Sequence, residues 1–127
     1  MVKITIDGPI RSGKNNMQFT RSGRHFPLKS WAIWRDGVVA SMMQQCRPLH
    51  LAEPCSARII YRPSDKRRRD VPGMVDALWH CLERAGIVND DTLIEDVEWI
   101  TDRNGIKPGA EIYIETNKYF KFSDGKK

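Results

Sequence analysis

Cysteine is scarce in this chain of 127 residues, and the few present are not spaced as metal ligands. The three residues, Cys46, Cys55 and Cys81, form no Cys-x-x-Cys pair. An odd number of scattered cysteines argues against a disulfide framework, and a structural zinc site would lack its paired ligands. We therefore expect free thiols in a reducing, intracellular compartment.

Long apolar runs are also missing from the sequence. No stretch approaches the ~18 apolar residues that a membrane span requires, and residues 1–4 carry no apolar segment of a secretory signal. Internal repeats are absent, and a chain of 127 residues fits one hydrophobic core rather than two. We expect a cytoplasmic protein with no membrane contact, built from one domain over residues 1–117 and a frayed polar tail over 118–127.

Positive charge exceeds negative charge, giving a formal net charge of +5. This favours an anionic partner, although an excess of this size is also common among ordinary soluble proteins. The cations that we expect to contact nucleic-acid phosphates lie in two segments: Arg11, Lys14, Arg21 and Arg24 in the first, and Lys66, Arg67, Arg68 and Arg69 in the second.

Hydrophobic periodicity predicts a strand, a helix and a second strand in the first half of the chain. Alternating apolar residues indicate a strand over 2–6, and the polar composition of 11–27 indicates a long basic loop. Ser30 is suited to cap a helix over 30–46, whose apolar residues recur at spacings of three and four. A run rich in β-forming residues predicts a strand over 57–61.

The second half predicts a helix and two more strands. Pro72 suits a first helical turn and Gly86 a C-terminal cap, so we expect a helix over 72–85. Strands over 93–101 and 112–114 are expected to pair antiparallel through the turn residues between them. The order βαβαββ predicts an α/β fold, a single domain whose mixed sheet has two helices packed on it.

One motif suggests nucleotide binding without fulfilling its requirements. The segment Gly8–Asn15 nearly matches the phosphate-binding pattern G-x-x-x-x-G-K-[ST], but Asn15 lacks the hydroxyl that ligates magnesium. No helical pattern follows Lys14, as the phosphate cradle requires. We therefore expect no nucleotide cofactor, and interpret the segment as a turn leading into a loop whose cations contact nucleic-acid phosphates.

Carboxylates cluster around the predicted helix over 72–85. Asp70 precedes the helix, Asp76 lies in its second turn, and Asp90 and Asp91 follow the turn after its end. Such groups suit Mg²⁺, or Mn²⁺ in its place, which can activate water against a scissile phosphodiester without a covalent protein intermediate. The alternative is structural, because acidic residues also stabilise helix starts and are common in turns.

These residues carry a resemblance to a known family. The sequences Arg68–Leu78 (RRDVPGMVDAL) and Ala85–Asp91 (AGIVNDD) resemble the RusA family of Holliday-junction resolvases, which carry R-D-L-D-N, a helix, A-G and D-D at this spacing. Residues 8–24 look like those of divergent phage-type members. The resemblance implies a homodimer that nicks opposed strands of four-way DNA junctions with Mg²⁺, in the cytoplasm of a bacterial or phage-infected cell. It places the family's acidic residues on Asp70 and Asp91, with Asp90 beside them.

Two positions depart from the family pattern. The family's second Asp is Pro72 here, and its catalytic Lys is Asp76. Positions four apart on a helix share a face, so a carboxylate lost at 72 and gained at 76 is consistent with relocation. On that hypothesis Asp70, Asp76 and Asp91 are catalytic and bind the metal together with Asp90, while Lys66 or Arg69 steadies the phosphate. The alternative is a junction- or duplex-binding protein with a disabled site.

Overall fold

The computed structural model describes residues 1–12, 17–19, 25–27, 29–66, 70–104 and 107–117. In chain order, its elements are β1 (Val2–Asp7), β2 (Met17–Phe19), β3 (His25–Pro27), α1 (Lys29–Gln45), β4 (Cys55–Arg62), α2 (Val71–Arg84), the short 3₁₀ helix η1 (Asp91–Leu93), β5 (Ile94–Thr101) and β6 (Gly109–Thr116). The predicted α/β class is confirmed, and so are the main helices and strands to within a few residues at each end.

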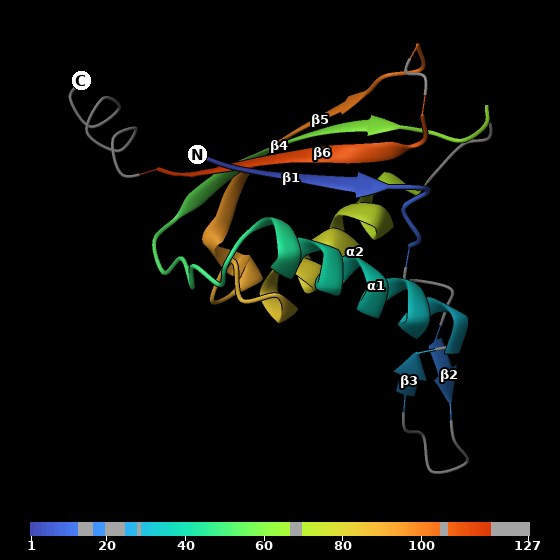
Figure 1. The fold of residues 1–127 in the computed structure, drawn as a ribbon, viewed down its shortest axis with the longest axis horizontal. Coiled ribbons are helices and arrows are strands. Elements are labelled where there is room, and N and C mark those ends of the chain that lie inside the picture. The colour runs from blue at the N-terminus through green and yellow to red at the C-terminus, as the bar shows by residue number, and fades with distance from the viewer. Residues whose placement is uncertain (13–16, 20–24, 28, 67–69, 105–106, 118–127) are drawn as a thin grey trace.

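Four strands form one mixed sheet in the order β1-β6-β4-β5. Strand β6 runs antiparallel to both β1 and β4, whereas β4 and β5 are parallel. Both helices cover the same face of this sheet, and among the described residues no helix covers its other face, called the open face below (Figure 1). The predicted mixed sheet with two helices packed on it is therefore confirmed.

The prediction that the last two strands pair with each other is wrong, because β4 lies between β5 and β6. The unit β4-α2-β5 is a crossover, which brings β5 back parallel to β4 on one edge. Strand β6 takes the other edge of β4 and closes the gap to β1. The turn chemistry at Asp102, whose side chain accepts from the Asn104 amide at 3.0 Å, bends the chain without making a hairpin.

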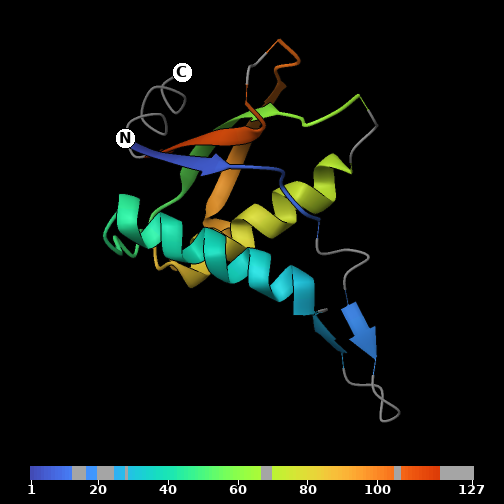
Figure 2. The same ribbon diagram turned by 45° about the vertical axis from the view of Figure 1, so that its right-hand side comes forward.

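The basic loop predicted over residues 11–27 contains two short strands. Strands β2 and β3 pair antiparallel, from Met17 opposite Pro27 to Phe19 opposite His25. They form a separate ribbon that projects beyond the N-terminal end of α1 (Figure 2). Strands of three residues are too short to produce a readable alternation of apolar and polar positions, which explains the error.

The core lies between the sheet and the helices. It contains the alternate residues of β1, β4 and β6 that face the helices, including Ile4, Ile59 and Ile112, all fully buried. Met42 of α1 and Leu78 of α2 pack against these residues from the helical layer, and both side chains are fully buried. This core fixes both ends of α2 relative to the sheet. No helix in the described part of the chain is both long and apolar enough to cross a membrane.

Candidate active site

The C-terminal end of α2 is fixed by Gly86, which has φ +73°. The Gly86 amide donates to Glu83 O and the Ile87 amide to Leu82 O, both at 3.0 Å, which is the glycine-terminated helix end expected from the sequence. A Cβ on Gly86 would lie 3.1 Å from side-chain atoms of His50 and Pro48, so the turn is tightly enclosed.

The loop before β4 holds the turn that follows α2. Amides of His50 and Leu51 donate to Gly86 O and Ile87 O, at 2.8 and 3.0 Å. The Asn89 amide donates back to Leu51 O at 2.9 Å. These backbone bonds lock the segment that leads into Asp90 and Asp91, so the two carboxylates have a defined position beside the last turn of α2.

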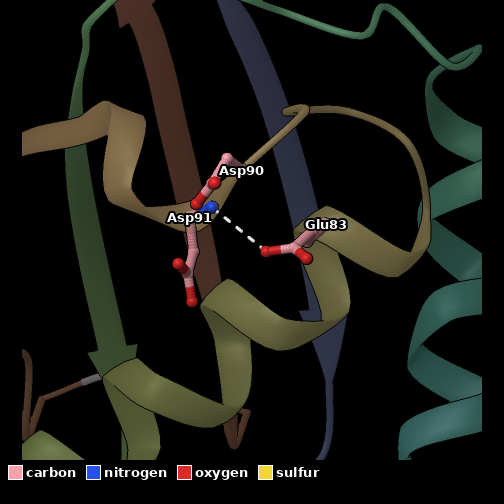
Figure 3. Close-up of side chains that lie close together, drawn as sticks. All are labelled: Glu83, Asp90 and Asp91. Atoms are coloured by element: carbon pink, nitrogen blue, oxygen red, sulfur yellow. Dashed lines mark hydrogen bonds between the residues drawn. The ribbon is translucent and has the colours of Figure 1, made fainter.

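Three carboxylates meet at this point: Glu83, Asp90 and Asp91 (Figure 3). Each offers one oxygen, and these oxygens lie within 4.8 Å of one another. The Glu83 side chain points toward the loop, and its Oε1 accepts a hydrogen bond from the Asp91 amide at 3.1 Å. An all-oxygen, all-carboxylate donor set suits a hard divalent cation such as Mg²⁺ or Mn²⁺.

The two aspartates differ in proton affinity. Partial burial raises the pKa of Asp91, and the neighbouring charges of Glu83, Asp90 and Asp76 add to that rise. Hydrogen bonds from Thr92 lower the pKa of Asp90, whose Oδ1 accepts from the Thr92 amide at 2.9 Å and from its hydroxyl at 2.8 Å. Asp91 is therefore the carboxylate of the cluster whose charged form is disfavoured by its surroundings, and a bound cation would relieve that repulsion.

Glu83 was missed by the sequence reasoning. It lies seven residues after Asp76 on α2, which is two helical turns and therefore the same helix face. That spacing is visible in the sequence. What the sequence did not reveal is the return of the chain at Gly86, which places Asp91 against Glu83.

The other two predicted ligands lie farther toward the start of α2. Asp76 is exposed and close enough to contribute to the raised pKa of Asp91. Asp70 is the N-cap of α2, and its side chain accepts from the Gly73 amide at 3.2 Å. At ~1.5 Å per residue, Asp70 stands roughly 20 Å along the helix axis from Glu83. The carboxylate cluster thus contains Glu83, Asp90 and Asp91, Asp76 acts on Asp91 through its charge, and Asp70 lies at the opposite end of α2.

Described residues that border the two basic segments, Ser12 and Asp70, meet at the start of α2. Ser12 is the last residue described before the gap at 13–16. Its hydroxyl donates a hydrogen bond to Asp70 Oδ2 at 3.4 Å. Arg11 donates to Ser30 O at 3.2 Å, which ties it to the start of α1, and Lys66 is exposed. The remaining predicted DNA-binding cations lie outside the described residues: Lys14, Arg21, Arg24, Arg67, Arg68 and Arg69.

A thiol nucleophile does not fit this helix. Burial raises the pKa of the Cys81 thiol to about 12, and the side chain is fully buried. His80 turns to the other side, where its ring lies 5.9 Å from the ring of Trp31. Cys81 is thus part of the core and offers no reactive thiolate.

The open face of the sheet has a different character. It carries a hollow of about 670 Å³ whose lining includes Asp96, Glu98 and Glu115. Its cation Arg58 is already paired with Glu98 at 2.5 Å. Three carboxylates in its lining do not favour a phosphate backbone in this hollow.

Comparison with known proteins gives one informative similarity. The chain is 24% identical over 94 residues to the crossover junction endodeoxyribonuclease RusA of Aquifex aeolicus. The aligned region covers 74% of this chain and 75% of that enzyme. No protein-family model matches the chain. This distant similarity agrees with the resemblance seen around Asp70 and Asp91.

Proposed function

We propose that the protein is a metal-dependent endodeoxyribonuclease that resolves four-way DNA junctions by paired nicks. The observation that carries the proposal is the meeting of Glu83, Asp90 and Asp91 at the end of α2, with Asp76 within electrostatic reach. The distant similarity to a crossover junction endodeoxyribonuclease supports the choice of branched DNA as substrate. In this proposal the acting compartment is the cytoplasm of a bacterial or phage-infected cell.

The proposed division of roles follows from the geometry. Asp91, Asp90 and Glu83 hold the cation, and Asp76 adds negative charge on the same side of α2. A bound Mg²⁺ would supply Lewis-acid activation of a water and of the scissile phosphate. Asp91 must be ionised to take part, and its raised pKa means that protons compete with the cation at acidic pH.

For Asp70, which the resemblance assigns to the metal, we propose a different role, because it lies at the opposite end of α2 from the carboxylate cluster. It caps α2 and receives the Ser12 hydroxyl, so it joins the two chain segments that carry the predicted DNA-binding cations. Lys66 and the cations of residues 67–69 precede it directly in the sequence. We propose that this end of the molecule grips the DNA backbone, while the C-terminal end of α2 cuts.

The test is incubation of the purified protein with an end-labelled four-way junction, and with a linear duplex of the same sequences. Each substrate is given Mg²⁺, Mn²⁺ or EDTA and resolved on native and denaturing gels. Paired, metal-dependent nicks in the junction and intact duplex support the proposal. A junction that is shifted but uncut in every metal supports the alternative, a binding protein whose site Pro72 and Asp76 have disabled.

A further inference from the structure

The carboxylate cluster at the end of α2 repels a phosphate backbone unless positive charge lies close to it. Glu83, Asp90 and Asp91 carry three negative charges when ionised, and a divalent cation balances two of them (Figure 3). Lys66, a described cation of the second basic segment, precedes the start of α2 and so stands near the other end of that helix. The proposed cut therefore requires a further cation at the end of α2 itself.

Arg84 occupies this end of α2. It is the basic residue of the last helical turn and follows Glu83 directly. Adjacent residues on a helix point about 100° apart, so the Arg84 side chain diverges from that of Glu83. Arg84 is exposed, and within the described part of the chain no carboxylate lies at ion-pair distance from its guanidinium. Its charge can therefore serve a ligand.

The surroundings of His80 show on which side of α2 this charge lies. Burial lowers the pKa of His80, and the positive charges of Arg35 and Arg84 lower it further, partly opposed by the carboxylates of α2. The lowered pKa favours a neutral His80 ring at pH 7. Arg35 lies 5.7 Å from the centre of the Trp31 ring and is paired with Asp36 at 3.0 Å. Among these described groups, Arg84 is the exposed cation that forms no ion pair.

A phosphate beside the scissile one fits the position of Arg84. Because its side chain diverges from that of Glu83, Arg84 lies to one side of the carboxylates that would hold the metal. Phosphates of one DNA strand follow each other every ~3.4 Å along the duplex axis, so a backbone that crosses the cluster also passes this side. A guanidinium can donate two parallel hydrogen bonds to the oxygens of one phosphate.

We propose that Arg84 binds a backbone phosphate next to the one that is cut, and so positions the strand over the carboxylate cluster. The inference rests on the proposed function, because it takes branched DNA as the ligand. Arg84 is a positioning residue in this arrangement, since it holds the strand and exchanges no proton with it.

Neutral backbone analogues test the contact. Four-way junctions are prepared with one methylphosphonate each, at successive positions around the cut, and binding is measured with Ca²⁺, whose looser coordination does not favour catalysis. At one position the analogue should weaken binding by the wild type about tenfold and leave binding by Arg84→Gln unchanged, because that variant has already lost the contact. Equal effects on the two proteins at every position overturn the inference.

Two further variants separate this contact from a general loss of charge. Arg84→Lys keeps the charge without the planar fork, so it should recover part of the affinity that Arg84→Gln loses. Arg103→Gln removes an exposed arginine from the turn after β5 and should respond to every analogue as the wild type does. Arg84→Gln should unfold at the wild-type temperature, because the site is exposed and the two residues have similar helix propensities. Loss of the same response in Arg103→Gln overturns the inference.

Failure of this inference and failure of the proposed function are distinguishable, because the contact is measured by binding and the activity by nicked strands. A wild type that cuts junctions but shows no coupling between Arg84 and any phosphate overturns the contact and leaves the nuclease. A wild type that shows the coupling and never nicks in Mg²⁺ or Mn²⁺ overturns the nuclease and leaves the contact. A protein that binds no junction overturns both.

Discussion

At the scale of single residues, the surroundings of Asp91 favour its protonated form, whereas its proposed role as a metal ligand requires the ionised form. Its carboxylate is partly buried beside Glu83 and Asp90, and all three of these influences raise its pKa. A folded-state pKa above the ordinary value of 3.8 means that the protonated form is favoured by folding. The associated stability is present below pH 3.8 and is lost as the pH rises through the folded pKa. On the proposed function, a bound divalent cation would offset that loss.

The first prediction follows from that repulsion. In metal-free buffer at neutral pH, Asp91→Asn should melt roughly 1–3 °C above the wild type, because it removes one charge from the cluster. The difference should shrink as the pH falls toward 3.8, where the wild-type carboxyl is protonated as well. Thermal unfolding by circular dichroism at a series of pH values measures this. If Asp91→Asn melts below the wild type at neutral pH, the ionised Asp91 carboxylate does not destabilise the fold, and the prediction is wrong.

The second prediction concerns Asp76, which replaces the lysine of the family pattern. Asp76→Asn should abolish junction cutting, because on the relocation hypothesis it removes the carboxylate that replaces the one missing at position 72. Junction binding should stay within about twofold of the wild type, because the side chain is exposed and the change is isosteric. Electrophoretic shift and cleavage assays on the same junction measure the two effects. Asp102→Asn is the control, because Asp102 is a half-buried aspartate in the turn after β5. Full cleavage by Asp76→Asn would sink the idea that the carboxylate moved from position 72 to 76.

At the scale of elements, α2 connects Asp70 at its start to the carboxylate cluster at its end. Its first turn is tightly packed around Gly73. A Cβ on Gly73 would lie 2.2 Å from Ser12 Oγ and 2.3 Å from Asp70 Oδ2. A side chain at position 73 must therefore push Asp70 away from its capping position, which breaks the link between Ser12 and the helix start.

The third prediction is that Gly73→Ala destabilises the protein by about 1 kcal/mol, the usual cost of a lost N-cap. Asp70→Ala should cost a similar amount, and the double variant should cost little more than either change alone. Asp70→Asn is the control, because asparagine caps helices as well as aspartate does. Urea unfolding measures all four proteins. Additive losses in the double variant would mean that Gly73 and Asp70 act independently.

The elements also show what sequence reasoning can and cannot reach. Helix α2 was predictable because Pro72, the apolar spacing and Gly86 all indicate the same helix. The pairing of the last two strands was not, because Asp102–Gly105 has turn chemistry whichever strand follows. Which edge of β4 receives β6 is decided by the α2 crossover, a long-range property. The same crossover decides that Glu83 joins the site, so that residue was missed.

At the scale of the whole molecule, charge is divided between surfaces. A hollow lined by Asp96, Glu98 and Glu115 lies on the face of the sheet away from the helices. Ser12 and Asp70, which border the two basic segments, meet at the start of α2, and the carboxylate cluster lies at its end. A DNA backbone is therefore expected along the helical side, across one end of the molecule and the edge beside α2. Affinity for DNA should fall steeply with salt whichever function is correct.

The fourth prediction is that a divalent cation stabilises the whole fold. On the proposed function Mg²⁺ or Mn²⁺ would bind the folded cluster and not the unfolded chain, so a concentration of 100 times the dissociation constant should add about 2.7 kcal/mol. Differential scanning calorimetry with and without the cation measures the shift in melting temperature. Glu83→Gln should reduce the shift, whereas Glu115→Gln, on the open face of the sheet, should not. An equal shift in both variants would place the cation elsewhere.

The central claim is that the carboxylates at the end of α2 bind the metal that cuts branched DNA. The most direct measurement is the single-turnover rate of four-way junction cleavage across a Mg²⁺ titration, for the wild type beside Asp91→Asn. We predict saturable, paired nicking by the wild type and a rate at least a hundredfold lower for Asp91→Asn, with junction binding retained by both; the hundredfold figure corresponds to roughly 2.7 kcal/mol of transition-state stabilisation. Equal rates for the two proteins, or no cleavage by the wild type at any Mg²⁺ concentration, would contradict the claim.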